Sequence, residues 1–297
     1  MELEHLRRIT AIGGGHGLGR LLSTLSFLER RLVGIVATTD NGGATGLLRQ
    51  THHCIAWGDI RNCLSQLVEQ PLAAEVLNYR FSGDTSLTGH NFGNLLLYTL
   101  DQLSARPLDG IQLLSRLLSV DTRLLPMSEN PTDLIATTHE GIDCYGEIRV
   151  DKLVRMPLSL RLNGSVSATP EAIRHIRRSD LIILGPGSFL TSVLPPLLVE
   201  DISQAIADSQ ANVLFIDNLV AEKSPAGQLS LAQRLAWLEQ QLGHQLIDAV
   251  ISNNNTHGVK VPVINSVQAD SDVPHRHDAE SLLQAIRSAV AQFHSAA

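Results

Sequence analysis

The sequence predicts an α/β fold: a Rossmann-like, mostly parallel sheet with helices on both faces, plus a helical and antiparallel β insertion. Three observations lead to this prediction. Short β-branched apolar runs recur along the chain, Gly-rich or Asn-rich turns follow them, and helical patterns follow the turns. This order is typical of parallel βα units. We expect a single domain over residues 1–297, with the insertion at about residues 62–165.

Five predicted strands end in loops that could bind a ligand, because ligands of open α/β sheets bind beyond the carboxyl ends of the strands. The first strand leads into Gly13–Gly19 and an amphipathic helix, and the second leads into Asp40–Gly46. The predicted strands are Ile9–Ile12, Leu32–Thr39, Asp180–Leu184, Val213–Ile216 and Ile247–Ser252.

The middle of the chain has a different pattern. From about residue 62 to residue 120, apolar residues recur at helical spacing. From about residue 121 to residue 163, short alternating segments predict antiparallel strands. The parallel sheet resumes after Thr169, a predicted N-cap, and Ala279–Phe293 predicts a closing helix. The alternating segments are Thr122–Leu125, Leu134–Thr137, Ile142–Val150 and Leu158–Leu162.

The charge balance excludes some classes of protein. The net charge is −7, and 18% of the residues are charged. An average protein has about 25% charged residues, so the low fraction favours a homo-oligomer in which a partner subunit covers part of the surface. No basic cluster is longer than two residues. We therefore expect no nucleic-acid partner.

The cysteines and the amino-terminal residues indicate a cytoplasmic protein. Cys54, Cys63 and Cys144 form no C-x-x-C motif, and an odd number is typical of a reducing compartment. Residues 1–8 carry charges with no apolar stretch behind them, so no signal peptide is predicted. Residues 181–199 are uncharged, but glycines and prolines interrupt them, so we expect no membrane partner.

The glycine-rich loops Gly13–Gly19 and Gly42–Gly46 are the main indication of a ligand. Glycines let the backbone approach a phosphate, and helix N-termini bind anions. Two such loops at neighbouring strand ends predict a diphosphate site, although glycines also serve simple tight turns. The G-x-G-x-x-G spacing of nicotinamide-binding proteins fails, because Leu18 and Arg20 take the last position in the two registers. We expect neither a nicotinamide nor a flavin cofactor.

Two polar clusters, residues 57–62 and 88–94, are predicted just ahead of helices. Asp59 and Asn91 could simply be N-caps. The clusters nevertheless contain more donors and acceptors than capping needs. Asp40 and Asp59 together could hold Mg²⁺, which prefers one or two carboxylates with phosphates and water.

The histidines and serines predict neither a zinc site nor a serine nucleophile. The runs 52–54 and 275–278 lack the spacing of metal ligands, since adjacent side chains of a strand point apart. Ser188 lacks the G-x-S-x-G motif and is interpreted as an N-cap at an anion-binding helix start. His16 and His90 are instead expected to form hydrogen bonds beside phosphates.

Six motifs occur in a fixed order along almost the whole chain: Gly13–Gly17, Thr38–Gly46, Gly58–Asn62, Gly89–Asn94, Leu184–Ser188 and Arg276–Asp278. Together they resemble the gluconeogenesis factors, the YvcK-like branch of the 2-phospho-L-lactate transferase (CofD-like) superfamily. The resemblance implies a modified Rossmann-like fold, a cytoplasmic location and binding of UDP-sugars such as UDP-glucose or UDP-N-acetylglucosamine. It also implies a role in cell shape and cell-wall metabolism on gluconeogenic carbon sources. It assigns no reaction and identifies no regulatory partner.

One motif departs from the family pattern. Members of the UDP-sugar branch carry a Gly-Tyr-Ser stretch that contacts the nucleotide, where this chain has Gly227-Gln228-Leu229-Ser230. The arginine of the carboxyl-terminal Arg-His-Asp motif is retained as Arg276. The transferase relatives join phospholactate to a deazaflavin alcohol through an activated nucleotide with Mg²⁺.

The expected function is therefore a UDP-sugar-binding regulatory protein, and the alternative is a Mg²⁺-dependent phosphoryl or nucleotidyl transferase that uses the same cleft. Recognition and activation of a diphosphate need the same donors, so the sequence does not separate them. No catalytic residue is assigned, and Asp40 and Asp59 are candidate metal ligands. The candidate ligand-binding residues are Gly13, Gly14, Gly15, His16, Gly17, Asn41, Gly42, Gly43, Thr45, Arg61, Asn62, His90, Asn91, Asn94, Gly185, Gly187, Ser188, Asn218, Asn253 and Arg276.

Overall fold

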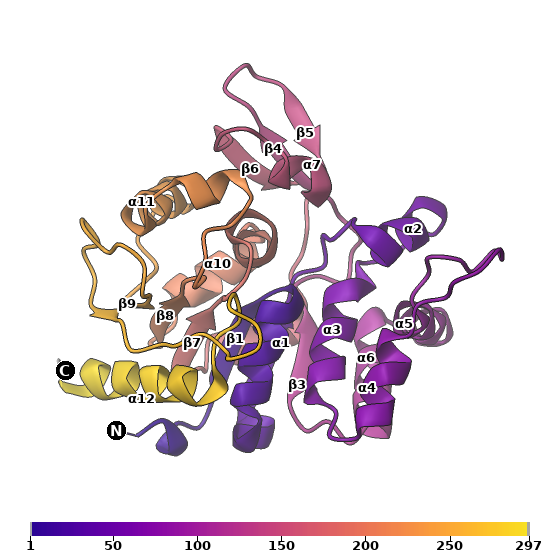
Figure 1. Ribbon diagram of the computed structural model, residues 1–297, viewed down its shortest axis with the longest axis horizontal. Helices are drawn as coiled ribbons and strands as arrows, with labels where there is room; N and C mark the ends of the chain where they lie inside the picture. Colours follow the sequence, from indigo (N-terminus) through magenta and orange to yellow (C-terminus); the bar gives the residue numbers. More distant parts are fainter. Residues whose placement is uncertain (1, 296–297) are drawn as a thin grey trace.

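The computed structural model describes residues 2–295. A seven-stranded sheet forms the centre of the molecule (Figure 1). Its strand order is β10-β9-β8-β7-β1-β2-β3, and all paired strands are parallel. The chain moves outward in opposite directions from β1 and from β7, so the order reverses between these two strands. The predicted α/β class is confirmed. The strands are β1 (Ile9–Gly13), β2 (Leu32–Val36), β3 (Arg123–Pro126), β7 (Leu181–Leu184), β8 (Asn212–Ile216), β9 (Ala249–Ile251) and β10 (Val263–Ile264).

Helices cover both faces of this sheet, which explains why the central strands are apolar throughout. Every residue of β1 and β2 is buried. Successive residues of β1 belong to different cores: Ala11 packs with α1, α3 and α12, and Ile12 packs with α8, α10 and α11. The helices are α1 (Gly15–Thr24), α2 (Gly43–Thr51), α3 (Trp57–Leu67), α4 (Pro71–Asn78), α5 (Phe92–Leu103), α6 (Pro107–Leu117), α7 (Glu147–Asp151), α8 (Pro170–Ile176), α9 (Leu194–Leu197), α10 (Glu200–Ala207), α11 (Leu231–Leu242) and α12 (Ala279–Ser295).

Shorter helical turns join several of these elements. The turn η3 is a π-helix that leads directly into α9, and the other three are 3₁₀ helices. They are η1 (Leu3–His5), η2 (Ser26–Arg31), η3 (Phe189–Val193) and η4 (Pro225–Gln228). No helix among residues 2–295 is long and apolar enough to span a membrane.

The region after β2 differs from the prediction in one strand. Helices α3 to α6 occur where the helical pattern predicted them, but Arg123–Pro126 then pairs with β2 in parallel. The prediction that Thr122–Leu125 belongs to an antiparallel meander was therefore wrong. A run of four residues shows alternation but carries no information about the direction of its partner strand. The division into a domain and an insertion at residues 62–165 stays a prediction.

A small antiparallel sheet of order β5-β4-β6 follows β3. Figure 1 shows this sheet and α7 at the top of the molecule, beyond the carboxyl ends of the main strands. The predicted strand Ile142–Val150 is only partly correct, because Gly146, with a φ of 88°, turns the chain from β5 into α7. Thr169 precedes α8 but does not cap it, since its hydroxyl donates to the carbonyl of Pro126 at 2.6 Å. The strands are β4 (Leu134–Thr137), β5 (Asp143–Tyr145) and β6 (Ser159–Leu162).

Candidate functional site

A cleft of about 740 Å³ lies at the carboxyl ends of β1, β7 and β8. This is the point where the strand order reverses, the usual ligand site of open α/β sheets. The start of α1, the loops after β7 and β8, and the segment before α12 all contribute to it. Six of the predicted ligand-binding residues line the cleft: His16, Gly17, Gly187, Ser188, Asn218 and Arg276.

Arginine side chains make the cleft suitable for an anion. The guanidinium of Arg276 lines it and has no hydrogen-bond or ion-pair partner within residues 2–295. Arg20 also lines it and pairs with Asp270 at 3.4 Å. The pKa of His16 is lowered, mainly by burial and further by the charges of Arg61 and Arg276. A neutral His16 can hydrogen-bond an oxyanion without adding charge of its own.

The Arg276 segment is attached to the end of β8. His277 is buried, and its Nε2–H donates to the backbone carbonyl of Asp217 at 3.1 Å. Burial lowers the pKa of His277, so the imidazole is held in its neutral form. Asn218, the next residue along the chain, lines the same cleft. The loop after β8 and the segment before α12 therefore occupy fixed relative positions.

A buried ion pair supports this attachment. The Asp217 carboxylate accepts two hydrogen bonds from Arg234 of α11, at 2.6 and 3.1 Å, and others from Ser252 and Asn254, at 2.8 and 2.9 Å. Sequence reasoning missed Asp217, Arg234 and Asn254. Asp217 did offer a signal, because it directly follows a predicted strand. Arg234 offered none, since one arginine in an amphipathic helix normally faces solvent.

The first glycine loop brings the start of α1 against Asp59. Gly14 is the N-cap of α1, and a Cβ atom at this position would collide with the Asp59 carboxylate. Gly15 has a φ of 59°, and its backbone N–H donates to the same carboxylate. Asp59 lies inside α3. The prediction that it precedes a helix was wrong. Asp59 is therefore not an N-cap, and it occupies part of the amide surface of this loop.

The second glycine loop lies on the other side of Asp59. Its Gly42 N–H donates to the Asp40 carboxylate at 2.6 Å. Asn41 accepts a hydrogen bond from the Ile148 N–H at 3.2 Å, which joins the loop to α7. Gly43 begins α2 with a φ of 46°, a backbone conformation that favours glycine over other residues. None of these residues lines the cleft.

Four carboxylates gather beside these two loops. Burial, and then the charge of Asp40, raises the pKa of Asp59 to about 7. Burial, followed by the charges of Asp40 and Asp59, raises the pKa of Glu147 to about 9. The pKa of Asp151 is about 6, raised by burial and by Glu222. Arg61 and nearby hydrogen-bond donors lower the pKa of Asp59 only in part, so burial and the neighbouring carboxylates keep it raised.

These carboxylates could hold a cation that keeps some of its water, but they do not form a site in which protein side chains supply every ligand. Within residues 2–295, no group of three or more His, Cys, Asp or Glu side chains is close enough to hold a metal ion. Mg²⁺ needs only one or two carboxylates when phosphates and water complete its shell. Asn62 lies beside Asp59, and its buried Oδ1 has no hydrogen-bond partner. Asp40, Asp59 and this oxygen are the groups that could hold the cation or its water.

The predicted cluster at residues 88–94 supports Arg61 rather than lining the cleft. Asn91 is the N-cap of α5, and its side-chain oxygen accepts a hydrogen bond from the Asn94 N–H at 3.1 Å. The interpretation of Asn91 as an N-cap is therefore confirmed. Asn94 accepts from Arg61 and donates to Thr45, each at 3.4 Å. His90 adds a backbone carbonyl that accepts from Phe81. These side chains connect α2, α3 and α5.

The loop after β7 differs from its prediction. Ser188 does not cap the following helix; its hydroxyl donates to Glu222 at 3.3 Å. The Glu222 carboxylate also accepts from the Phe189 N–H at 3.0 Å, so it takes the place that an anion would have at this helix start. The interpretation of Ser188 as an N-cap was wrong because the sequence does not show which distant carboxylate reaches the loop.

The remaining predicted residues lie near the strand ends without facing the cleft. Gly13 ends β1, and Gly185 directly follows β7 with a φ of 77° and lies close to the carbonyl of Ile216 in β8. Asn253 donates to the Val267 carbonyl. Its neighbour Asn254 makes the contacts with the Asp217 network.

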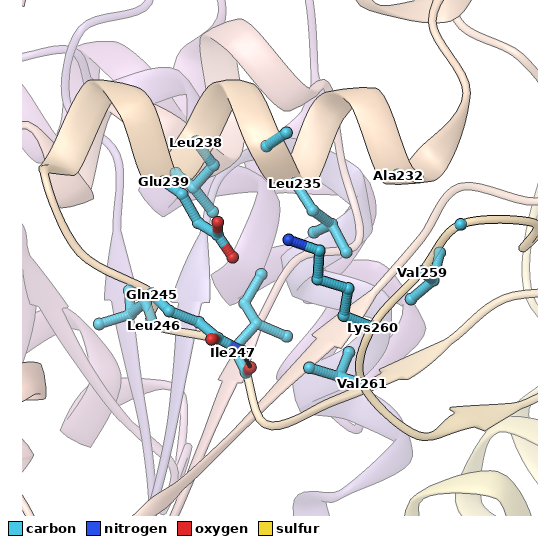
Figure 2. Close-up of a pocket in the computed structure, with 12 residues that line it drawn as sticks. Ala232, Leu235, Leu238, Glu239, Gln245, Leu246, Ile247, Val259, Lys260 and Val261 are labelled. Atoms are coloured by element: carbon cyan, nitrogen blue, oxygen red, sulfur yellow. Dashed lines mark hydrogen bonds between the residues drawn. The ribbon is translucent and has the colours of Figure 1, made fainter.

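A smaller pocket of about 50 Å³ lies away from these loops (Figure 2). It is enclosed by α11 and by residues 245–247 and 258–261. Figure 2 shows mainly aliphatic side chains around it, with Glu239 and Lys260 pointing into it. Its volume suits a few waters, so it does not compete with the cleft as a ligand site.

The fold and the cleft define the class: an α/β protein of Rossmann type with an arginine-lined cleft where its strand order reverses. The chain belongs to the CofD family, described as 2-phospho-L-lactate transferase CofD, which matches residues 9–293.

Proteins of known name and structure are similar over nearly the whole chain. A "Putative gluconeogenesis factor" of Yersinia pestis is 48% identical, with 99% of this chain and 97% of that protein covered. One of Pasteurella multocida is 46% identical, with 96% and 94% covered. A crystal structure of a UPF0052 family protein from Bacillus halodurans has a TM-score of 0.87 at 28% identity, covering 94% of this chain and 98% of that one. The predicted membership in the gluconeogenesis-factor branch is confirmed.

Proposed function

We propose that this protein binds a UDP-sugar, such as UDP-glucose or UDP-N-acetylglucosamine, in the cleft between β1, β7 and β8. The observation that carries the proposal is the guanidinium of Arg276, which has no hydrogen-bond or ion-pair partner among residues 2–295 and lines a cleft of about 740 Å³ together with the start of α1. A guanidinium offers paired donors to a diphosphate, and the start of a helix offers N–H groups. The volume lies within the range of about 300 to 1,000 Å³ typical of small-molecule sites.

We propose further that this binding serves regulation of cell shape and of cell-wall and carbon metabolism, in the cytoplasm. The similarity to gluconeogenesis factors supports the metabolic role. Three free cysteines, Cys54, Cys63 and Cys144, support a reducing compartment. We propose that the protein forms a homo-oligomer and acts on a regulatory partner that is not identified. The proposal includes no binding to nucleic acid or to a membrane.

Isothermal titration calorimetry with UDP-glucose, UDP-N-acetylglucosamine and NAD⁺ tests the ligand. We expect heat of binding for a UDP-sugar and none for NAD⁺. A ligand present at 100 times its dissociation constant should add about 2.7 kcal/mol to the free energy of unfolding, so a thermal-shift measurement gives an independent check. Absence of both effects for both UDP-sugars would refute the proposal.

A second candidate, a Mg²⁺-dependent phosphoryl or nucleotidyl transferase, rests on the carboxylates beside the glycine loops. Asp40 and Asp59 would hold the ion, which would neutralise phosphate charge. Glu147, whose pKa is raised to about 9, could hold a proton at neutral pH. Turnover of UDP-glucose or of GTP, followed by chromatography with and without Mg²⁺, separates the candidates, because a binding protein releases its ligand unchanged.

A further inference from the structure

A second large cavity lies at the amino-terminal edge of the main sheet, opposite the cleft. Its volume is about 550 Å³, and it lies between η2, the end of α6 and the start of β3. Arg30, Arg116 and Arg123 line it, together with one carboxylate, that of Asp121. In a protein of net charge −7, this is a local concentration of positive charge.

Within the described part of the chain, residues 2–295, one of these three arginines is paired with an acid. Arg30 reaches Asp121 at 3.5 Å. Arg116 donates from Nε to the carbonyl of Gln112 at 3.3 Å, which leaves its charge uncompensated. The guanidinium of Arg123 has no hydrogen-bond or ion-pair partner among residues 2–295.

The positive field extends into the protein. His175, at the end of α8, has a pKa of about 4, lowered mainly by burial and further by the charges of Arg123 and Arg8. The charge of Arg123 therefore acts on a neighbouring group inside the protein.

The arginines are not needed to cap α6, which is the ordinary reason for basic residues near a helix end. The backbone N–H groups of the next three residues satisfy its last carbonyls. Leu118 donates to Leu114 at 3.0 Å, Ser119 to Arg116 at 3.1 Å, and Val120 to Ser115 at 2.9 Å. Ser119 has a φ of 55°, which belongs to this closing turn.

We propose that this cavity is a second binding site, for a small metabolite with two or more negative charges on carboxylate or phosphate oxygens, held between Arg116 and Arg123. Two guanidiniums facing one cavity can each donate a pair of hydrogen bonds to such an oxyanion. Ser119 and Thr122 line the same cavity and add hydroxyl groups. No aromatic ring of the described residues lines it, so it offers no stacking surface for a nucleobase. The ligand class therefore differs from that proposed for the cleft.

Calorimetric titrations with citrate and with glucose 6-phosphate at constant ionic strength test the proposal. We expect at least one of them to bind, and we expect Arg116→Gln/Arg123→Gln to weaken it at least tenfold. Arg178→Gln is the matched control, because Arg178 is exposed, also precedes a strand of the main sheet and does not line the cavity. It should change the dissociation constant less than twofold. Equal melting temperatures of the unliganded proteins show that the double variant is folded.

A second comparison separates this site from the cleft. Arg276→Gln should leave citrate or glucose 6-phosphate binding unchanged, whereas it should weaken UDP-glucose binding. Binding of citrate alone identifies a polycarboxylate site, and binding of glucose 6-phosphate alone identifies a phosphomonoester site. The proposal is overturned if neither anion binds, if the double variant binds as tightly as the native protein, or if Arg178→Gln or Arg276→Gln causes the same loss.

Discussion

The guanidinium of Arg234 donates two parallel hydrogen bonds to the carboxylate of Asp217, at 2.6 and 3.1 Å, and both side chains are buried. The backbone of Asp217 also holds His277, next to Arg276. A single ion pair between α11 and the end of β8 thus fixes one wall of the cleft.

Arg234→Met should destabilise the protein by about 3 to 5 kcal/mol, because it leaves the Asp217 carboxylate buried without its charged partner. Urea unfolding measures this change. In the double variant Asp217→Asn/Arg234→Met no charge is left unpaired, so it should recover part of the loss. A double variant less stable than Arg234→Met would contradict this account of the ion pair.

Gly14→Ala should abolish binding of UDP-sugars in a folded protein. The new Cβ would collide with the Asp59 carboxylate and displace the start of α1. Gly13→Ala is the matched control, since a Cβ there meets its nearest neighbours at 3.7 to 3.8 Å, an ordinary contact. Calorimetry on both variants checks the prediction, and equal affinity in the two would show that the approach of Gly14 to Asp59 has no role in binding.

The contribution of Asp59 to the stability of the native protein should fall as the pH rises from about 4 to about 7. The pKa of Asp59 is about 7 in the folded state against an ordinary value of 3.8. In this window the folded protein keeps a proton that the unfolded chain has lost, so the free energy of unfolding decreases with pH. Asp59→Asn should flatten this slope and stabilise the protein at pH 8, by roughly 1 to 4 kcal/mol.

Urea unfolding at pH 5, 6, 7 and 8 measures the slope. Asp278→Asn provides the control, because hydrogen bonds from the Ser281 backbone and hydroxyl groups lower the pKa of Asp278 below its ordinary value of 3.8. Its carboxylate is ionised in the folded and the unfolded protein throughout pH 5 to 8, so this variant should keep the slope of the native protein. The same slope in the native protein and in Asp59→Asn would mean that Asp59 titrates normally.

Removal of Mg²⁺ should weaken binding of UDP-glucose to the native protein and have little effect on Asp40→Asn. A carboxylate beside a diphosphate repels it unless a cation lies between them. Titrations with EDTA or with 5 mM Mg²⁺ measure the difference. If chelation changes neither protein, Asp40 and Asp59 serve the sugar hydroxyls or the loop structure instead.

Arg276→Ala should weaken UDP-sugar binding by about 1.5 to 3 kcal/mol, roughly tenfold or more. Arg276→Lys should recover only part, because an ammonium group cannot offer paired donors in one plane. Calorimetry with UDP-glucose and UDP-N-acetylglucosamine measures both variants. Native affinity of Arg276→Ala for both ligands would place this side chain outside the site.

The predictable part of the fold is local. Apolar runs such as Ile9–Ile12 predicted buried parallel strands because helices must cover both faces of such a sheet. Glycines at residues 13–19 predicted a sharp turn into a helix, and the family motifs predicted that Arg276 belongs to the ligand site. The structure places Arg276 and His16 at one cleft, although 260 residues separate them in the chain.

Tertiary structure alone decided which side chains meet. Arg123 begins β3, and the pattern of four residues does not show whether that strand pairs in parallel or antiparallel. Glu222 lies after β8 and accepts a hydrogen bond from the loop after β7. Asp59 was expected as a possible cap and is instead a buried acid beside Gly14. Propensity and spacing act over a few residues. Burial, charge proximity and the pKa values that follow from them depend on the packing of segments that are distant in the chain, which no local pattern encodes.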